Sequence, residues 1–464
     1  MDLALPRLES RERPAGIRSL GNWLLCWIVL PNLAYWLLLL VGGPPRPWPI
    51  LITGLLGLAA HRAPFPVKFA LFLAGMVVSA LFFISALFNL SILSLVHSLK
   101  FAAELNPSAS FEYIVCAIAV AATLLCAWWL LRRPTAFVEP KGMLLAIAAI
   151  LLAISIDGAM AAGSRGSYQR TPSPNAPFAS AAEDSGIARL ATGDRHVLMI
   201  MVEAMGQPTS PALRSMLVDI WARPEVRARY EVITGDTLFY GSTTHGEMRE
   251  LCGRWADYDQ VLHRRDAGCL PSVLAARGYR SSAWHSFSGT FFDRTSWYPN
   301  IGFQEMRFAP ELLEAGAQPC PGVFAGACDR DIPRQIGAAL RRARQPQFLY
   351  WLTVNTHLPV LSNRALGTEH CERFDVALDR DHPQVCRLLQ LFDQSGRELA
   401  REIAGADFPA TDILIVGDHI PPFFDRQHRG QFEPDRVPWI LLRPKPRSAP
   451  GAIAAGPPDS RPAA

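Results

Sequence analysis

The chain has 464 residues, of which 50% are hydrophobic and 19% are charged, and its formal net charge is +4. The charged share lies below the roughly 25% of an ordinary soluble protein, so the composition disfavours a purely soluble globular protein. The small net charge and the scattered arginines argue against a dedicated nucleic-acid binder, and the aliphatic content excludes disorder for most of the chain.

Five apolar blocks lie in the N-terminal third of the chain. A helix needs about 20 apolar residues to cross the hydrocarbon core of a bilayer, and four of the blocks meet that length. The second block is shorter, so a re-entrant or interfacial segment is its alternative. We expect a transmembrane domain of five helices over residues 1–162, from blocks at 22–41, 49–60, 69–95, 113–131 and 143–162.

The basic residues set the orientation of these helices. Five crossings leave only Arg46 and Lys100 on one side of the membrane and all other basic residues of the region on the opposite side. Cytoplasmic loops carry the excess of Lys and Arg, so we expect the N-terminus inside and everything after about residue 163 outside. The inside residues are Arg7, Arg11, Arg13, Arg18, Arg62, Lys68, Arg132, Arg133 and Lys141.

The cysteines of the external part indicate disulfides. An even number of cysteines in an oxidising compartment is typical of a disulfide set, and six cysteines allow 15 connectivities. We favour pairing between sequence neighbours, which closes short loops; a structural metal cluster is the alternative, although no C-x-x-C pair is present. The six residues are Cys252, Cys269, Cys320, Cys328, Cys371 and Cys386.

The external part divides by composition. Residues 163–190 are rich in Ser, Pro, Ala and Gly and predict a linker, and residues 448–464 predict a disordered tail. Residues 191–447 alternate short apolar runs with amphipathic stretches, which predicts an α/β domain with a largely parallel central sheet. Candidate strands are 196–202, 279–284, 348–354 and 412–416, and candidate helices lie near 210–230, 270–278, 331–343 and 382–403.

Carboxylates and imidazoles follow all four candidate strands. One such residue is usually a turn former or helix cap, but four strand exits carry them, and ligands bind beyond the carboxyl ends of strands in open α/β sheets. We therefore expect these side chains to meet in one crevice, where they would suit a divalent cation and, through it, a phosphoryl group. The residues are Glu203, His285, His357, Asp418 and His419.

A nucleophile is available in the glycine-flanked segment YGSTTHGEMRELCG, residues 240–253. It offers the hydroxyls of Ser242, Thr243 and Thr244. The alternative is a plain turn that opens a helix at Glu247. A metal favours the catalytic interpretation, because coordination lowers the pKa of a hydroxyl and lets it attack phosphorus.

Four segments resemble signature stretches of the alkaline phosphatase superfamily: VEAMG, GSTTHGEM, VNTHLP and VGDHIPPF. More narrowly, they resemble its membrane-anchored, sulfatase-like branch, which holds lipoteichoic acid synthases, phosphoglycerol transferases and phosphoethanolamine transferases. This resemblance implies N-terminal spans, an external α/β catalytic domain and a divalent metal ion, zinc or manganese, with magnesium also compatible.

The resemblance implies roles for individual residues. Glu203, Asp418 and His419 match metal ligands. Thr243 matches the nucleophile, which also ligates the metal, and Thr244 stays the alternative. His357 matches the substrate-site histidine, which serves in proton transfer or acceptor binding.

A second set of roles concerns the substrate. The segment HSFSGTFFDR, residues 285–294, resembles one that contacts the phosphate head group in the synthases. It implies that Arg294 binds phosphate, with Phe292 and His285 beside the substrate. His428 matches a later histidine with a second-metal or acceptor role in the phosphoethanolamine transferases.

These expectations combine into one function. The chain is expected to move a phosphoethanolamine or phosphoglycerol group from a membrane phospholipid, through a phosphothreonine, to an envelope glycan or lipid acceptor at the bacterial inner membrane. A sulfatase or phosphodiester hydrolase of the same fold is the competing enzyme. The segment at Cys269 comes close to the C/S-x-P-x-R context of a sulfatase nucleophile but lacks the Arg. A non-catalytic membrane scaffold for envelope polymer assembly is the alternative of a different class.

Overall fold

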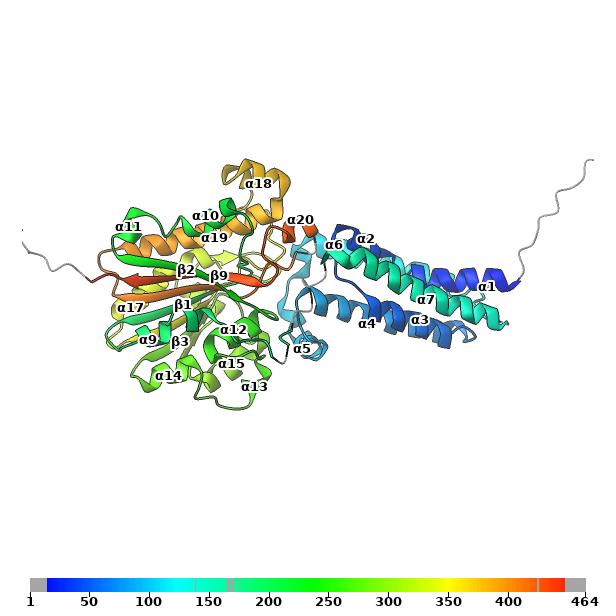
Figure 1. Ribbon diagram of the computed structural model, residues 1–464, viewed down its shortest axis with the longest axis horizontal. Helices are drawn as coiled ribbons and strands as arrows, with labels where there is room; N and C mark the ends of the chain where they lie inside the picture. Colours follow the sequence, from blue (N-terminus) through cyan, green and yellow to red (C-terminus); the bar gives the residue numbers. More distant parts are fainter. Residues whose placement is uncertain are drawn as a thin grey trace, which may run out of the picture.

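A computed structural model describes residues 15–137, 139–164, 168, 171–173, 175–423 and 425–446. The molecule is elongated, with a helical bundle at one end and an α/β domain at the other (Figure 1). The predicted tail, the basic residues Arg7, Arg11 and Arg13, and part of the predicted linker lie outside the described residues.

The helical bundle contains fewer long helices than the sequence predicts. By length and composition, three described helices can cross a membrane: α4 (Phe65–Leu87), α6 (Phe111–Leu130) and α7 (Pro140–Met160). The first predicted block is broken into α1 (Ala15–Leu24), a π-helical turn (Leu25–Val29) and α2 (Leu33–Val41), and it bends by 48°. With α3 (Pro47–Ala59) at only 13 residues, five crossings remain a prediction.

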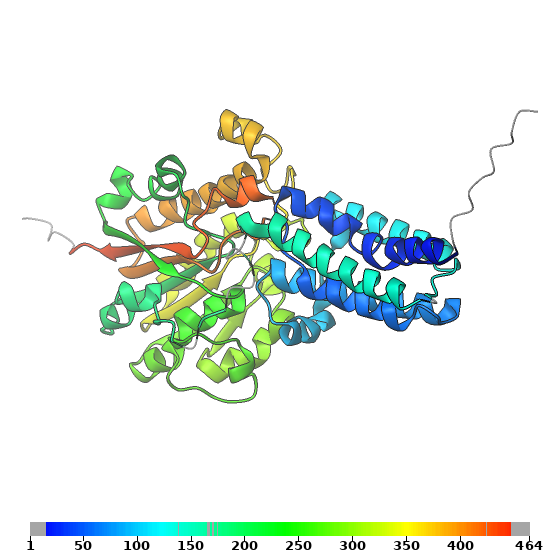
Figure 2. The ribbon, with the colours of Figure 1, turned by 45° about the vertical axis from the view of Figure 1, so that its right-hand side comes forward.

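Small residues let the bundle helices approach closely. In α3, a Cβ on Gly57 would overlap the Trp27 ring, and one on Gly54 would lie 2.6 Å from Ile150 of α7. Trp27 and Ile150 belong to one buried cluster that extends through the bundle. The short helix α3 is therefore an integral part of the bundle, and Figure 2 shows it beside α4.

The α/β domain is built on a mixed sheet of seven strands in the order β2-β9-β8-β1-β7-β3-β4. The central β1 (His196–Val202) pairs in parallel with β7 (Gln347–Leu352) and β8 (Thr411–Gly417). The parallel part continues through β3 (Arg280–His285) and β4 (Glu305–Arg307).

The other edge of the sheet makes it a mixed sheet, through one antiparallel strand. There, β9 (Arg436–Pro444) runs antiparallel to both β8 and β2 (Tyr230–Leu238). The sequence analysis identified β1, β3, β7 and β8 and missed β2, β4 and β9. Hydrophobic periodicity indicates a strand but carries no information on its direction, which non-local pairing decides.

Helices cover both faces of the sheet, as Figure 1 shows. One face packs on α10 (Pro211–Val218), α17 (Ile332–Arg342) and α19 (Pro383–Ala404), and the other on α12 (Thr243–Cys252) and α14 (Leu270–Ala276). Alternate residues of β1 enter the two cores, which explains its unbroken apolar run. The shorter elements are α8 (Ala181–Asp184), α9 (Ile187–Leu190), α11 (Pro224–Arg227), α13 (Asp259–Leu262), α15 (Arg294–Trp297), α16 (Ala309–Glu314), α18 (Val376–Asp381), α20 (Arg426–Arg429), β5 (Pro319–Cys320) and β6 (Gly326–Ala327).

All six external cysteines are paired with their sequence neighbours, which confirms the predicted pairing. The disulfides are Cys252–Cys269, Cys320–Cys328 and Cys371–Cys386. Each closes a short loop of the α/β domain.

The connection between α4 and α6 lies against the α/β domain. It contains α5 (Ile92–Ser98), which takes up the end of the third predicted apolar block. Ser94 Oγ donates to Asp257 Oδ2 at 3.1 Å, Lys100 Nζ donates to Asp293 Oδ1 at 2.7 Å, and the Asn106 amide donates to the Val323 carbonyl at 2.9 Å. The bundle and the α/β domain therefore meet through specific polar contacts.

The central sheet gives a stability prediction. Leu414 of β8 is fully buried, so Leu414→Ala should lower the free energy of unfolding by about 2–5 kcal/mol through lost burial and the cavity left behind. Thermal unfolding of the full chain in detergent measures the change. Val376→Ala is the control, because Val376 is 69% exposed and should change stability little.

Candidate active site

Four polar side chains from distant parts of the sequence meet at the carboxyl end of the sheet. Glu203 follows β1, Asp418 and His419 follow β8, and Thr243 is the first residue of α12. The ligand atoms of Glu203, Asp418 and His419 lie within 4.8 Å of one another. The Thr243 hydroxyl donates to Glu203 Oε2 at 3.0 Å and lies 3.3 Å from His419 Nε2.

This cluster has the donor set of a divalent metal site. Glu203 Oε1 and Asp418 Oδ2 are buried and accept no hydrogen bond from the described residues, although His419 Nε2 lies 3.5 and 3.4 Å away. Unsatisfied buried carboxylate oxygens are costly. Two carboxylates, an imidazole and a hydroxyl are oxygen and nitrogen ligands suited to zinc, manganese or magnesium, so the residues fit the metal that the sequence predicts.

Backbone amides hold the Asp418 carboxylate in place. Asp418 Oδ1 accepts hydrogen bonds from the amides of Ala204 at 2.8 Å and His419 at 2.6 Å. Ala204 has a φ of 56°, a left-handed conformation that is rare outside glycine. Such strain tends to occur at functional sites.

Two threonines that the sequence analysis missed hold Glu203 from the other side. Thr353 Oγ1 accepts a hydrogen bond from the Glu203 amide at 2.9 Å, and Thr356 Oγ1 donates to the Glu203 carbonyl at 2.6 Å. Thr356 lies in the VNTHLP segment, and Thr353 directly precedes it. The segment therefore marked both threonines, but a role was predicted only for its histidine, His357.

Burial and charge shift the pKa values of the cluster. Burial, helped by the Glu203 carboxylate, raises the pKa of Asp418 to about 7. Burial alone would lower the pKa of His419, but the carboxylates of Asp418 and Glu203 outweigh it and raise the pKa overall. The metal-free site therefore takes up protons near neutral pH, as expected where negative charges are crowded.

The nucleophile segment distinguishes its two threonines. Thr243 is partly exposed and its hydroxyl faces the cluster, whereas Thr244 is fully buried and donates to Asp257 Oδ1 at 2.6 Å. Gly246 lies against Asp418, where a Cβ would come within 3.0 Å of the Asp418 Cβ. Thr243 also stands at the N-terminus of a 10-residue helix, which favours an anion beside it.

His357 lies beside the cluster and is neutral at physiological pH. Burial is the main cause that lowers its pKa to about 4, and the charges of His419 and Asp418 also act on it. Its Nδ1 lies 2.9 Å from the Leu358 carbonyl, which places the proton on Nδ1 and the lone pair on Nε2. The ring of Phe324 lies 3.7 Å from the His357 ring, measured between centroids.

Arg294, the predicted phosphate ligand, is engaged in a buried ion pair. Its guanidinium is buried: Nη2 donates to Glu247 Oε2 at 2.9 Å, Nε to the same oxygen at 3.2 Å, and Nη1 to the Phe291 carbonyl at 3.1 Å. Tyr298 and Tyr350 also donate to Glu247. A fully buried cation requires a paired anion, so this network occupies the guanidinium.

The other predicted substrate residues have contacts of their own. Phe292 packs its ring on Phe291, with centroids 4.6 Å apart. His285 is buried with Nδ1 3.0 Å from the Leu352 carbonyl, and its pKa lies well below the usual value, chiefly because of burial. His428 lies in α20, 3.8 Å from Asp425. No contact joins these residues to Thr243 within the described chain.

Cys269, the cysteine in the near-match to a sulfatase motif, is not available as a nucleophile. Cys269 is fully buried and forms the disulfide with Cys252. A sulfur held in a disulfide is not free for conversion to formylglycine.

A protein-family model and a curated relative both match this chain. The family model described as Sulfatase matches residues 195–452, more than half of the chain. A curated relative from Rhizobium meliloti (strain 1021), described as "Putative cyclic beta-1,2-glucan modification protein", is 24% identical over 248 residues, which cover 50% of this chain. The chain spans 36% of the length of that relative.

Solved structures with a similar fold include the lipoteichoic acid synthase LtaP from Listeria monocytogenes, at 13% identity and a TM-score of 0.42, covering 56% of this chain and 67% of that one. The Streptococcus pyogenes phosphoglycerol transferase GacH has 16% identity and a TM-score of 0.36, with 58% and 77% covered. The zinc complex of the periplasmic domain of EcEptC from Escherichia coli has 12% identity and a TM-score of 0.38, with 55% and 74% covered.

The raised pKa of Asp418 predicts how metal binding depends on pH. Below about pH 7 a proton on Asp418 competes with the metal, so affinity should fall by about tenfold per pH unit for each proton displaced. Titration of the metal-free protein with Mn²⁺ between pH 5 and 8 measures this. An affinity independent of pH over that range would contradict the arrangement.

Proposed function

The chain belongs to the sulfatase family, and from that premise we propose that it is a metal-dependent transferase. It moves a phosphoethanolamine or phosphoglycerol group from a membrane phospholipid to an envelope glycan or lipid. The observation that carries this proposal is the hydrogen bond from the hydroxyl of the partly exposed Thr243 to the carboxylate of buried Glu203, with Asp418 and His419 beside it.

The residues of the cluster have distinct tasks. Glu203, Asp418, His419 and Thr243 would hold one divalent cation, Zn²⁺ or Mn²⁺, with Mg²⁺ also compatible. When bound, the cation lowers the pKa of the threonine hydroxyl and stabilises charge on the phosphoryl oxygens. The Asp418 carboxylate is kept in position by the Ala204 and His419 amides.

The reaction proceeds in two displacements. In the first, the Thr243 oxygen bonds to phosphorus while the bond from phosphorus to the diacylglycerol oxygen breaks. The threonine proton goes to solvent, and the leaving oxygen takes one up from solvent. In the second, an acceptor hydroxyl attacks the phosphothreonine, the bond from phosphorus to Thr243 breaks, and neutral His357 accepts the proton of the acceptor through Nε2. The Thr243 oxygen takes up a proton from solvent, and His357 releases its proton to solvent.

The membrane part explains how the donor is reached. We propose five crossings with the N-terminus inside and the catalytic domain, residues 191–447, on the outer side of the bacterial inner membrane after a linker at 163–190. Three disulfides suit that oxidising location. Attachment to the bilayer keeps the site near phospholipid head groups, which raises their effective concentration.

The acceptor and the remaining predicted residues belong to the proposal as well. The description of the Rhizobium meliloti relative supports a glycan acceptor. The approach to the site is lined in this proposal by Phe292, His285 and His428. If a second metal ion binds, His428 is its proposed ligand. Arg294 stabilises the nucleophile helix through Glu247 of α12.

The identity of the nucleophile can be tested by mass spectrometry of the intact protein after incubation with membrane phospholipid. A phosphoethanolamine or phosphoglycerol group should appear on the peptide that contains Thr243. Thr243→Ala should abolish this adduct and reduce transfer by about 10³-fold or more, because removal of a nucleophile removes the covalent route. Metal binding should stay largely intact.

Thr244→Ser is the matched control, since it keeps the hydroxyl that donates to Asp257. It should retain transfer. An adduct on Thr244, or full activity of Thr243→Ala, would refute the assignment. An adduct-free wild type that releases the head group into water would identify a phosphodiester hydrolase, and a chain without any turnover would support the scaffold.

A further inference from the structure

One short loop contacts both halves of the candidate site. Residues 353–357 follow β7 directly. Thr353 and Thr356 bond the amide and the carbonyl of Glu203, and His357 ends the same loop. The position of this loop therefore determines where the Glu203 carboxylate and the His357 imidazole point.

Asp329 holds this loop through its backbone. The Asp329 side chain is only 5% exposed, and its Oδ2 accepts hydrogen bonds from the Val354 amide at 3.0 Å and the Asn355 amide at 2.7 Å. Hydrogen bonds to an ionised carboxylate are roughly twice as strong as neutral ones. Two of them on consecutive residues restrict the loop at its centre, between Thr353 and Thr356.

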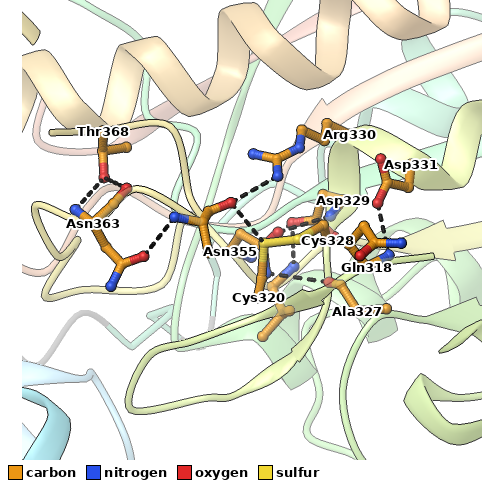
Figure 3. Close-up of a disulfide and its surroundings, with 12 residues drawn as sticks. Gln318, Cys320, Ala327, Cys328, Asp329, Arg330, Asp331, Asn355, Asn363 and Thr368 are labelled. Atoms are coloured by element: carbon orange, nitrogen blue, oxygen red, sulfur yellow. Dashed lines mark hydrogen bonds between the residues drawn. A yellow bond between two sulfur atoms is a disulfide. The ribbon is translucent and has the colours of Figure 1, made fainter. Parts of the chain in front are cut away.

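Asn355 in turn bonds the segment that contains Asp329. Its Oδ1 accepts a hydrogen bond from the Asp329 amide at 2.7 Å, and its Nδ2 donates to the Ala327 carbonyl at 3.3 Å. Figure 3 shows Asp329 and Asn355 side by side, next to the Cys320–Cys328 disulfide. The two segments are thus connected by four hydrogen bonds in both directions.

The segment before Asp329 is a disulfide-closed hairpin. It consists of β5 and β6, and Cys320–Cys328 joins its two ends immediately before Asp329. Its turn carries Phe324, whose ring contacts His357. The hairpin and the residue that follows it therefore contact the site loop at two points: Phe324 lies on the imidazole, and Asp329 bonds the backbone.

We propose that Asp329 and Asn355 are positioning residues of the active site, which hold loop 353–357 so that Glu203 and His357 face the metal and the substrate. The hairpin 319–328 is the base from which they act. Neither residue touches the reacting groups, so neither is catalytic. This inference rests on the proposed function for the identity of the cluster, but it concerns metal affinity before any group transfer.

A positioning role differs measurably from a merely structural one. Removing a buried, hydrogen-bonded carboxylate destabilises most proteins. Only the removal of a residue that positions a metal ligand also weakens the metal affinity of the folded protein. Partners outside the immediate ligands typically change metal affinity by 10- to 100-fold when mutated.

The first experiment uses Asp329→Asn in the full chain in detergent, at a temperature below its unfolding transition. Zn²⁺ and Mn²⁺, each alone, are titrated against a competing chelator. The uncharged amide is a weaker acceptor for the Val354 and Asn355 amides, so affinity should fall by about 10- to 100-fold. Asp331→Asn is the matched control.

Asp331 suits this purpose because it lies in the same turn but bonds elsewhere. Its Oδ2 accepts the Gln318 amide at 2.8 Å, away from loop 353–357. Asp331→Asn should change metal affinity by less than about twofold, because outer partners affect the metal only through its ligands. An equal loss in both variants would show that the effect is general and would overturn the proposal.

A second pair of variants tests the step from the loop to Glu203. Thr356→Val keeps the shape of the side chain and removes its hydrogen bond to the Glu203 carbonyl, while Thr356→Ser keeps the hydroxyl. Metal affinity should fall in the first and be retained in the second. If Asp329 acts through this loop, the effects of Asp329→Asn and Thr356→Val should be non-additive in the double variant.

The outcomes separate this inference from the proposed function. Unchanged metal affinity in folded Asp329→Asn, or additive effects in the double variant, overturns the positioning role. A wild type that binds neither Zn²⁺ nor Mn²⁺ overturns it together with the metal site. A wild type that binds metal with the expected variant pattern but transfers no phosphoryl group overturns only the proposed function.

Discussion

The structure depends on the close approach of two buried carboxylates, those of Glu203 and Asp418. Each has one oxygen that accepts no hydrogen bond from the described residues. Burial, helped by the Glu203 carboxylate, raises the pKa of Asp418 to about 7, and the two carboxylates raise the pKa of His419 above its usual value. Like charges in a buried site are unfavourable unless protons or a cation neutralise them. A cation bound between the two carboxylates would neutralise these charges.

Much of the surrounding polar network holds this arrangement in place. The Arg249 guanidinium donates to the carbonyls of Gly417 at 2.7 Å and Asp418 at 3.1 Å, and it pairs with Glu250. The buried pair of Glu247 and Arg294 fixes the same helix, α12, whose first residue is Thr243. Preorganised groups of this kind do not have to rearrange during a reaction, which is where much of the catalytic benefit of a protein site arises.

The contacts between the bundle and the α/β domain link the candidate site to the membrane part. The α4–α6 connection bonds Asp257, which accepts from Thr244 next to Thr243, and Asp293, which precedes Arg294. Phe88 at the end of α4 lies 6.1 Å from the His357 ring, between centroids. The candidate site therefore lies where the bundle meets the α/β domain.

The sequence by itself determined the elements whose signals are local. The buried strands β1, β3, β7 and β8, the disulfide pairing, and the residues that meet at the candidate metal site were all readable, because apolar runs, short loops and polar strand exits are patterns within a few residues. Tertiary structure decided the antiparallel β9, the broken first apolar block, and the burial of Arg294 against Glu247. It also decided the roles of Asp329, Asn355 and Thr356, since hydrogen bonds between segments far apart in the chain leave no periodic trace in the sequence.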